Sequence, residues 1–432
     1  MIPYGKQLIE DDDIQAVVDV LRSDFLTQGP MVAAFEEAFA RRVGTKHAVA
    51  VNSGTAALHA CMVALGIGPG DEVIVPPITF TASANCVLFV GGTPVFADVT
   101  TSGHIDPAQI ELKVTKKTKA VIAVDYAGWP CDYARILDLC RKHGLTLICD
   151  ACHALGASWQ GKPVGSIGRL NSFSFHPVKH IATGEGGMIT TDDDTLAERM
   201  REFRTHGITK DASRFKGLIS EDRGQRKEVS IDASQSTNQP INQSTIASLR
   251  ELGPWHYEMH SLGYNYRLSD INCALGLSQL NKLDRFVTRR REIAKVYYDG
   301  LKDIPHLELP ISDLVPASMI PYPVSTVYGL PSTVSPSCHS FHLFPVLIDF
   351  PALGKNRTQL MAELRTKGVG TQVHYIPVCL QPYYQRRLGT KTGDYPDAEA
   401  FFGRELSIPM YAGMSNDDIV CVTKAIGDVL RR

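Results

Sequence analysis

The segment NSFSFHPVKHIATGEGG, residues 171–187, decides the fold and carries the residue around which the other motifs gather. Its first half alternates polar and apolar residues, which predicts a β-strand. Lys179 follows this strand, and the glycines after it favour turns, so we expect the lysine on a loop at the strand end. Ligands of open α/β sheets bind outside the carboxyl ends of the strands. Taken alone, Lys179 would be a solvated surface lysine; the rest of the sequence favours a chemical role.

Short apolar segments alternate with helical ones along the N-terminal half of the chain. This rhythm predicts an α/β fold with a largely parallel sheet and helices on both faces. No G-x-G-x-x-G motif follows the first strand, which disfavours a dinucleotide-binding fold. The strands are expected at residues 47–51, 72–77, 94–99, 120–125, 146–150 and 188–191.

Composition limits the partners. The chain has 432 residues, is 44% hydrophobic, and balances 44 Lys+Arg against 46 Asp+Glu for a formal net charge of −2. The balance gives no reason to expect nucleic acid or an anionic membrane surface as a partner, which leaves small molecules or a second copy of the chain. No apolar run reaches membrane-spanning length and no secretion signal is recognised, so a cytoplasmic protein is expected.

The ten cysteines are scattered and do not form a framework. Cys149 and Cys152 have the C-x-x-C spacing of a zinc or redox site, but no second pair or histidine cluster completes four ligands. We therefore expect reduced cysteines and no metal.

Two further segments point to a site near Lys179. Asn52 begins NSGTAAL after the first strand, where Ser53 can cap a helix whose first N–H groups face an anion. Asp150 ends the strand LICD, which places a carboxylate at the same sheet edge as Lys179. Each segment alone fits an ordinary helix cap. Together, a lysine, an acid and an anion site match the needs of pyridoxal phosphate (PLP).

Six ordered motifs make the match specific. The chain resembles the DegT-type sugar-nucleotide aminotransferases, a branch of the fold type I PLP enzymes. The resemblance implies a large domain with a mostly parallel seven-stranded sheet and a smaller α+β C-terminal domain. The motifs are NSGTAAL, PxxTFxASAN, PVFADV, CDACHALGA, SFSFHPVKHIATGEGG and GYNYRLSDINCALGLSQL.

The resemblance implies a role for each matching residue. Lys179 would bind PLP as a Schiff base, and Asp150 would keep the ring nitrogen protonated. Phe80 would stack on the ring, and His153 would lie beside the ring and its 3′-oxygen. Asn265 would reach the phosphate of the neighbouring subunit, so that each site of a homodimer depends on both chains. The phosphate would be held by Gly54, Thr55, Ala56 and Ser174.

Some members of the family are dehydratases that carry a histidine in place of the lysine. Lys179 therefore favours transamination, in which its free amine serves as a general base. The flanking His176 and His180 are each explained equally well as substrate-side or structural residues.

The substrate side departs from the family in two places. Residues 373–384 resemble the sugar-side motif, but Cys379 stands where relatives usually have a histidine, and Asp125 replaces the histidine of HYAG. Both changes bear on the substrate more than on the cofactor. The residues assigned to substrate binding are Tyr4, Gln28, His176, His374 and Tyr375.

Within the family, residues 1–30 and the lysine segment most resemble members that serve pseudaminic acid synthesis. Those members transfer an amino group from L-glutamate to C4 of a UDP-linked 4-keto-6-deoxy-N-acetylhexosamine, giving UDP-4-amino-4,6-dideoxy-N-acetyl-β-L-altrosamine. Three alternatives stay open: an aminotransferase for another 4-keto or 3-keto sugar nucleotide, a PLP-dependent sugar dehydratase or lyase, and a sugar-nucleotide binder without activity.

The expected domains are a PLP-binding domain at residues 1–290 and a small domain at 291–432. A polar tract at about 214–252 cannot bury enough apolar surface to offset ordering, and we interpret it as an insertion. A second irregular loop is expected at about 310–336. One long helix, residues 268–298, would link the domains and support the dimer, and residues 341–350 would form a strand of the small domain.

Overall fold

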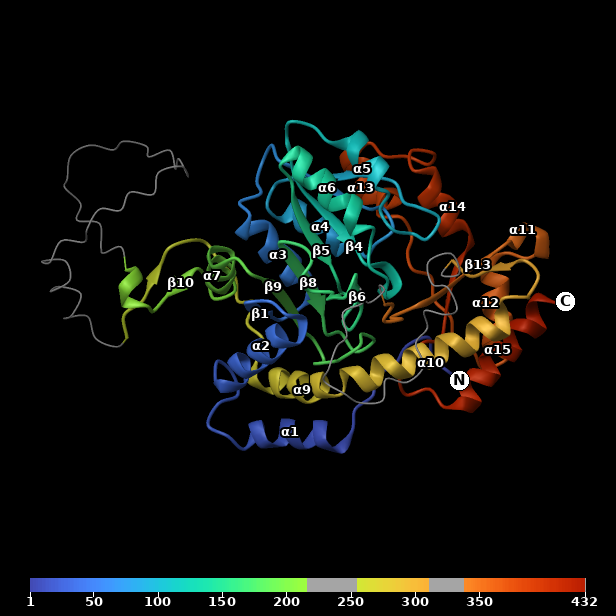
Figure 1. The fold of residues 1–432 in the computed structure, drawn as a ribbon, viewed down its shortest axis with the longest axis horizontal. Coiled ribbons are helices and arrows are strands. Elements are labelled where there is room, and N and C mark those ends of the chain that lie inside the picture. Colours follow the sequence, from blue (N-terminus) through green and yellow to red (C-terminus); the bar gives the residue numbers. More distant parts are fainter. Residues whose placement is uncertain (216–254, 311–337, 432) are drawn as a thin grey trace, which may run out of the picture. The chain divides into compact units, whose positions relative to one another are not determined.

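The computed structural model describes residues 1–215, 255–310 and 338–431. They fall into two units, Met1–Met200 with Tyr266–Arg432, and Arg201–Asn265. Nearly all of the predicted polar insertion and of the predicted irregular loop lies outside the described residues. The predicted domain boundary after residue 290 stays a prediction. Figure 1 shows the elements of the fold.

A large sheet dominates the first unit. Over the described residues it has seven strands in the order β1-β9-β8-β5-β4-β2-β3 (Figure 1). Only β9 runs antiparallel to its neighbours, whereas the pairs from β8 to β3 are parallel. The predicted mostly parallel sheet is confirmed. Its strands are β1 (His47–Val51), β2 (Glu72–Val75), β3 (Thr93–Phe96), β4 (Thr118–Val124), β5 (Thr146–Asp150), β8 (Leu170–Ser174) and β9 (Gly187–Thr191).

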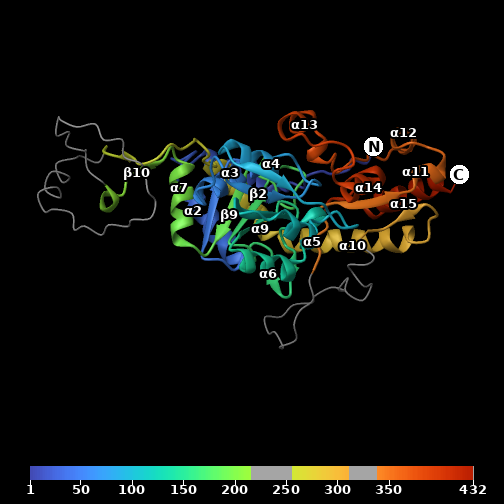
Figure 2. The same ribbon diagram turned by 90° about the horizontal axis from the view of Figure 1, so that it is seen from above.

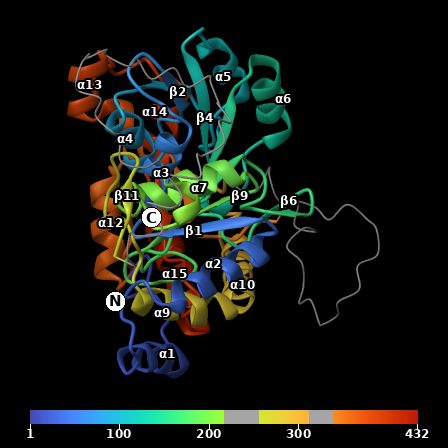
Figure 3. The ribbon, with the colours of Figure 1, turned by 90° about the vertical axis from the view of Figure 1, so that its left-hand side faces the viewer.

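Helices cover both faces of this sheet, as the alternating pattern predicts. Figure 3 shows α4 on one side of β2 and β4, with α5 and α6 on the other. Near β8, the aromatic rings of Phe173 and Phe175 pack against Phe35 and Phe39 of α2. The helices of this part are α2 (Pro30–Val43), α3 (Gly54–Ala64), α4 (Ala82–Phe89), α5 (Pro107–Lys113), α6 (Tyr133–His143) and α7 (Asp194–Phe203).

The helix ends follow the local sequence. Ser53 precedes α3 and its hydroxyl accepts a hydrogen bond from the Ala56 N–H at 3.0 Å, which confirms the predicted cap. Pro30 begins α2, where a missing N–H costs nothing, and Gly44 ends it in the left-handed conformation that glycine adopts without strain. The α3 N-terminus is thereby fixed directly after β1, at the sheet edge.

The predicted single helix over residues 268–298 is wrong: two helices, α9 (Asp270–Asn281) and α10 (Leu283–Leu301), run end to end (Figure 1). Ser269 caps α9 as predicted. Lys282 separates the helices and points its amine at Asp12 and Asp13 of α1 (Asp11–Leu21), with nitrogen–oxygen distances of 2.5 and 2.8 Å. The periodicity of residues 268–298 does not reveal this interaction, because Asp12 and Asp13 lie far from Lys282 in the sequence.

A three-stranded antiparallel sheet forms a second core, counted over the described residues. Figure 2 shows α12, α14 and α15 beside it near the C-terminus. The predicted strand at residues 341–350 is shorter in the structure, because β13 begins only at Phe344. The elements are β12 (Leu307–Glu308), β13 (Phe344–Ile348), α11 (Phe350–Leu353), α12 (Arg357–Thr366), η4 (Val378–Leu380), α13 (Pro382–Leu388), α14 (Pro396–Arg404), β14 (Glu405–Ile408) and α15 (Asn416–Leu430).

Short elements complete the description. Strands β6 (Ser158–Trp159) and β7 (Lys162–Pro163) form a hairpin, and η1 (Tyr126–Gly128) follows β4. In the second unit, β10 (Ile208–Thr209) pairs with β11 (Glu258–Met259), and η2 (Ala212–Arg214) lies between them in the chain. Within the described ranges, no helix has the length and apolar character needed to cross a membrane.

Candidate active site

A cavity of about 570 Å³ lies where the carboxyl ends of β5 and β8 meet the N-terminus of α3. Residues 372–375, which follow α12, also line it. The cavity therefore occupies the sheet edge at which ligands of α/β folds bind. The predicted site residues that line it are Tyr4, Gly54, Thr55, Phe80, Asp150, His153, Ser174, His176, Lys179, His374 and Tyr375.

Three predicted residues are placed otherwise. Ala56 is buried, and its N–H donates to Ser53 as part of the helix cap. Gln28 is exposed, with a positive φ of 56°, and is not among the described residues that line the cavity. Asn265 belongs to the second unit. The roles assigned to Ala56, Gln28 and Asn265 stay predictions.

Lys179 lies on the loop after β8, as predicted. Its N–H donates to the His176 carbonyl at 2.8 Å in a tight turn, and its side chain lines the cavity. Burial lowers the pKa of Lys179 below its ordinary value, against an opposing effect of Cys152 and Asp150. The neutral amine, which is the nucleophilic and basic form, is therefore reached more easily than on an exposed lysine.

Steric constraints explain the glycines that follow Lys179. Gly184 has a φ of 82°, which favours glycine. A Cβ at Gly187 would lie 2.4 Å from the Ser53 carbonyl oxygen, so only glycine lets β9 begin this close to α3. Residues 184–187 thus allow the lysine loop and the N-terminus of α3 to lie at the same cavity.

Asp150 ends β5 and is 6% exposed. Its Oδ2 accepts a hydrogen bond from the Ser83 hydroxyl at 2.7 Å, and the Ser83 and Thr79 hydroxyls lie 2.7 Å apart. Its Oδ1 accepts from the Cys152 N–H at 3.3 Å. These contacts hold the carboxylate in one orientation at the cavity wall.

Gly54 and Ser174 lie against each other at the start of α3. A Cβ on Gly54 would lie 2.9 Å from the Ser174 Cβ, closer than such atoms approach, so glycine is required for this contact. The free N–H groups and the positive dipole end of α3 favour an anion here. Gly54, Thr55 and Ser174 thus all line the cavity at the N-terminus of α3, and their role in holding a phosphate stays a prediction.

Aromatic and histidine rings also line the cavity. Phe80 is 59% exposed, and its ring centroid lies 6.2 Å from that of Tyr375. The Tyr375 hydroxyl lies 3.1 Å from His153 Nε2, and the two rings are nearly parallel at 6.1 Å. Burial, and then the nearby Lys179, lower the pKa of His153 well below its ordinary value, so the ring is neutral.

His342 was not predicted as a site residue. Its Nε2 lies 3.4 Å from Lys179 Nζ, and its ring centroid is 4.3 Å from that of His153. It lies two residues before β13, and its carbonyl accepts a hydrogen bond from the buried Arg290 of α10 at 3.2 Å. The only sequence signal was the histidine-rich run CHSFH before the strand, and nothing in its spacing connects it to Lys179.

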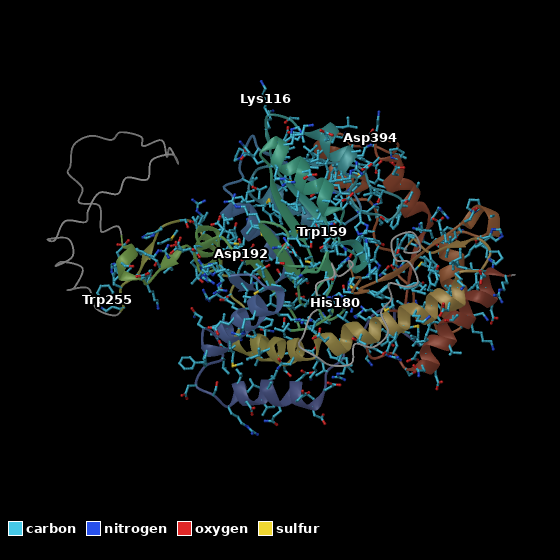
Figure 4. The ribbon with its side chains drawn as sticks, viewed as in Figure 1. Lys116, Trp159, His180, Asp192, Trp255 and Asp394 are labelled. Atoms are coloured by element: carbon cyan, nitrogen blue, oxygen red, sulfur yellow. The ribbon has the colours of Figure 1, made fainter. Side chains whose placement is uncertain are left out.

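His180, which follows Lys179, contacts the segment before β13. Its Nε2 lies 3.1 Å from the Ser340 carbonyl oxygen, and its ring lies 5.7 Å from that of His342. Figure 4 shows His180 near helix α10. It is buried and is not among the described cavity-lining residues, which favours the structural interpretation. His176, by contrast, is exposed and lines the cavity.

The two departures from the family lie away from the cavity lining. Asp125 is buried and accepts hydrogen bonds from the Tyr133 hydroxyl and the Cys131 N–H, at 2.6 and 3.0 Å. Burial raises its pKa to about 7. Cys379 is buried in η4. Neither residue is among the described residues that line the cavity, although Asp125 directly follows Val124, which does line it.

The residues present fit PLP. Gly54 lets the N-terminus of α3 lie against Ser174, where both residues line the cavity, and Asp150 offers a fixed carboxylate near Lys179. Among the described residues, the buried Nδ1 atoms of His153 and His342 have no hydrogen-bond partner, which leaves both free to bind a polar ligand. A lysine and a carboxylate that line one cavity are the groups that a PLP-dependent enzyme needs, and Lys179 and Asp150 therefore indicate that class of protein.

The chain belongs to the DegT/DnrJ/EryC1/StrS aminotransferase family, whose model matches residues 7–427. It is 38% identical over 433 residues to the spore coat polysaccharide biosynthesis protein SpsC of Bacillus subtilis (strain 168), covering 100% of this chain and 97% of SpsC. It is thus a PLP-dependent aminotransferase with a fold type I architecture.

Solved structures agree with this assignment. Helicobacter pylori PseC, an aminotransferase involved in the biosynthesis of pseudoaminic acid, is 30% identical, with a TM-score of 0.81 over 100% of this chain and 99% of PseC. The putative sugar aminotransferase Spr1654 from Streptococcus pneumoniae, in its PLP form, is 28% identical, with a TM-score of 0.80 over 100% of this chain and 98% of that chain.

Proposed function

We propose that this aminotransferase moves an amino group from L-glutamate to C4 of a UDP-linked 4-keto-6-deoxy-N-acetylhexosamine. The product would be UDP-4-amino-4,6-dideoxy-N-acetyl-β-L-altrosamine, for pseudaminic acid synthesis. The observation that carries the transferase chemistry is Lys179 facing the cavity with Asp150 near it. The likeness to PseC over the whole chain supports the choice of sugar.

In this proposal each residue has a physical task. When bound, PLP supplies an electron sink for the amino group's carbon. Lys179 Nζ, neutral more often than an exposed amine, would carry the proton from the α-carbon of glutamate to the cofactor carbon that takes up the amino group, and would carry a proton in the reverse direction to C4 of the sugar. Asp150 holds positive charge at the ring nitrogen, and its bond from Ser83 keeps it in place.

The cavity walls orient the reactants. Gly54, Thr55 and Ser174 would hold the phosphate at the α3 N-terminus, and Phe80 would stack on the ring and exclude water. The sugar side is formed by residues that line the remaining cavity wall: Tyr4, His176, His374 and Tyr375. A homodimer would complete each site through Asn265 of the neighbouring subunit.

A second sugar nucleotide is the alternative. SpsC is more similar to this chain than PseC is, at 38% against 30% identity, which leaves room for another 4-keto or 3-keto acceptor. A substrate panel separates the two proposals.

The test is a half-reaction. The PLP-loaded protein is treated with L-glutamate until its visible absorbance band is lost, and UDP- and dTDP-linked 4-keto sugars are then offered singly. We expect the UDP-linked 4-keto N-acetyl sugar to restore the band, and Lys179→Ala to show no response to glutamate. Restoration only by a dTDP-linked or 3-keto sugar would contradict the proposed acceptor while leaving the transaminase chemistry intact.

A further inference from the structure

The cavity residue His374 is held firmly from behind. Gln372 and Ser407 of β14 exchange backbone hydrogen bonds of 3.1 and 2.8 Å, which fix the chain just before His374. The Tyr126 hydroxyl donates to the His374 carbonyl at 2.7 Å. Contacts with β14 and η1 therefore fix the backbone of His374, which lines the cavity.

A chain of hydrogen bonds runs from this ring to a buried acid. His374 Nδ1 lies 2.9 Å from the Ser407 hydroxyl, and that hydroxyl lies 2.6 Å from Glu405 Oε1. Glu405 is 0% exposed, and its Oε2 accepts a bond from the His374 N–H at 2.9 Å. Both carboxyl oxygens of Glu405 thus act on one cavity residue.

The Ser407 hydroxyl has one proton, so the chain has two arrangements. If Glu405 is ionised, Ser407 donates to it and accepts from His374 Nδ1–H, which leaves Nε2 as an acceptor. If Glu405 is protonated, it donates to Ser407, which donates to His374 Nδ1, and the proton of the ring moves to Nε2. The protonation of Glu405 thereby selects the tautomer that faces the cavity.

The groups around Glu405 set the pH at which it changes protonation, and with it the tautomer of His374. Burial raises its pKa to about 8, opposed by the hydrogen bonds from Ser407 and the His374 N–H and by the charge of Arg357 on α12. Tyr126 on η1 also faces it, with a pKa raised well above its ordinary value by burial, and so stays uncharged. Burial and Lys179 lower the pKa of His374 to about 3, so its ring is neutral whichever tautomer is present.

We propose that Glu405 is a positioning residue for substrate recognition: through Ser407 it holds His374 as the Nε2–H tautomer, so that His374 donates a hydrogen bond to a substrate oxygen. Ionisation of Glu405 at alkaline pH converts His374 to an acceptor, which repels such an oxygen. This inference rests on the proposed function, because it takes the occupant of this cavity wall to be the keto-sugar or the amino donor.

Glu405→Gln separates the electrostatic role from a structural one. The glutamine amide N–H₂ can donate to Ser407 while its oxygen accepts from the His374 N–H, which reproduces the protonated arrangement at every pH. In ¹⁵N-histidine-labelled holoenzyme, with His374→Asn used to assign the signal, we expect the wild-type His374 signal to change tautomer between about pH 6.5 and 9.5. The Glu405→Gln signal should keep the Nε2–H form throughout.

Kinetics give an independent readout. Loss of one neutral hydrogen bond should raise the wild-type KM for the affected substrate about three- to tenfold across the same pH range, with little change in kcat. Glu405→Gln should have a flat KM profile, and Ser407→Ala should uncouple the His374 tautomer from pH. Glu363→Gln, which alters a surface pair with Lys355, is the matched control and should titrate like the wild type.

A His374 tautomer that stays constant in the wild type, or that titrates unchanged in Glu405→Gln, would overturn the inference. The wild-type titration decides alone if Glu405→Gln does not fold. The spectra need no substrate, so a tautomer change in a protein that rejects every UDP-linked sugar would contradict only the proposed function.

Discussion

The amine of Lys179 is surrounded by neutral and negative groups that make it chemically useful. His342 Nε2 lies at hydrogen-bonding distance, and Asp150 raises the lysine's pKa against the stronger effect of burial. His342 itself is buried, and burial, Lys179 and the neighbouring histidines keep its pKa well below the ordinary value. A neutral imidazole can therefore accept a proton from, or orient, the lysine amine.

Replacement of His342 by glutamine should slow the glutamate half-reaction about tenfold, equivalent to ~1.4 kcal/mol of barrier, because Lys179 loses an oriented partner. Stopped-flow loss of the visible absorbance band measures this rate. His143→Gln, at the end of α6 and far from the cavity lining, should react at the wild-type rate. An unchanged rate in His342→Gln would show that the 3.4 Å contact has no catalytic consequence.

At the scale of elements, the site depends on close backbone approaches. The start of α3 touches Ser174 at the end of β8 and the start of β9, and glycine is required at both contacts. A strand, a helix and a loop can then present their polar ends to one anion.

Gly54→Ala tests the closeness of α3 to β8. The added methyl group would lie 2.9 Å from the Ser174 Cβ, so we expect a loss of about 1–3 kcal/mol in stability and a weaker affinity for PLP. Thermal unfolding and titration of the apoprotein with PLP measure the two effects. Gly68→Ala is the control, because its Cβ would meet nothing within 4 Å. Equal PLP affinities in the two variants would contradict a phosphate site at Gly54.

The ion pair between Lys282, at the junction of α9 and α10, and Asp13 predicts that stability depends on pH. Burial acts to raise the pKa of Asp13, but hydrogen bonds from Lys282 and Ser278 bring it below its ordinary value. A lowered pKa in the fold stabilises the protein above the ordinary value of 3.8, and this stabilisation is lost as the pH falls through the folded value. Acid should therefore weaken the attachment of α1.

Lys282→Met should lower the free energy of unfolding by about 3 kcal/mol at neutral pH, because it leaves the buried Asp13 without its cation. Its loss of stability on acidification should be smaller than in the wild type, because Lys282 no longer holds the pKa of Asp13 below its ordinary value. Urea unfolding at several pH values measures both. Lys142→Met, which removes only a surface pair with Glu111, should cost far less stability. A similar cost for both variants would refute the buried role of Lys282.

At the scale of the molecule, the proposed homodimer predicts complementation between two inactive variants. If Asn265 serves the neighbouring site, a mixed dimer of Lys179→Ala and Asn265→Ala subunits has one intact site and one doubly altered site. Random mixing should restore about a quarter of wild-type activity, since half of the dimers are mixed. No recovery after verified subunit exchange would show that Asn265 acts within its own subunit.

The sequence predicted the strand-end residues well because strand order and side-chain position follow from local pattern. Lys179, Asp150 and Ser174 each end or follow an apolar strand, and parallel strands bring such ends to one edge. Family resemblance added Phe80 and Tyr375. His342 was missed because its neighbour is Lys179, 163 residues earlier in the chain, and no local pattern records that distance.

The sequence by itself determined the α/β fold, the lysine loop and the cofactor class, because these depend on hydrophobic period, turn residues and short motifs. Only the tertiary structure decided how residues distant in the chain act on one another. Lys282, between α9 and α10, pairs with acids of α1, and Glu405 of β14 accepts a hydrogen bond from the His374 N–H. Hydrogen bonds and burial depend on positions in space, which a linear pattern does not specify.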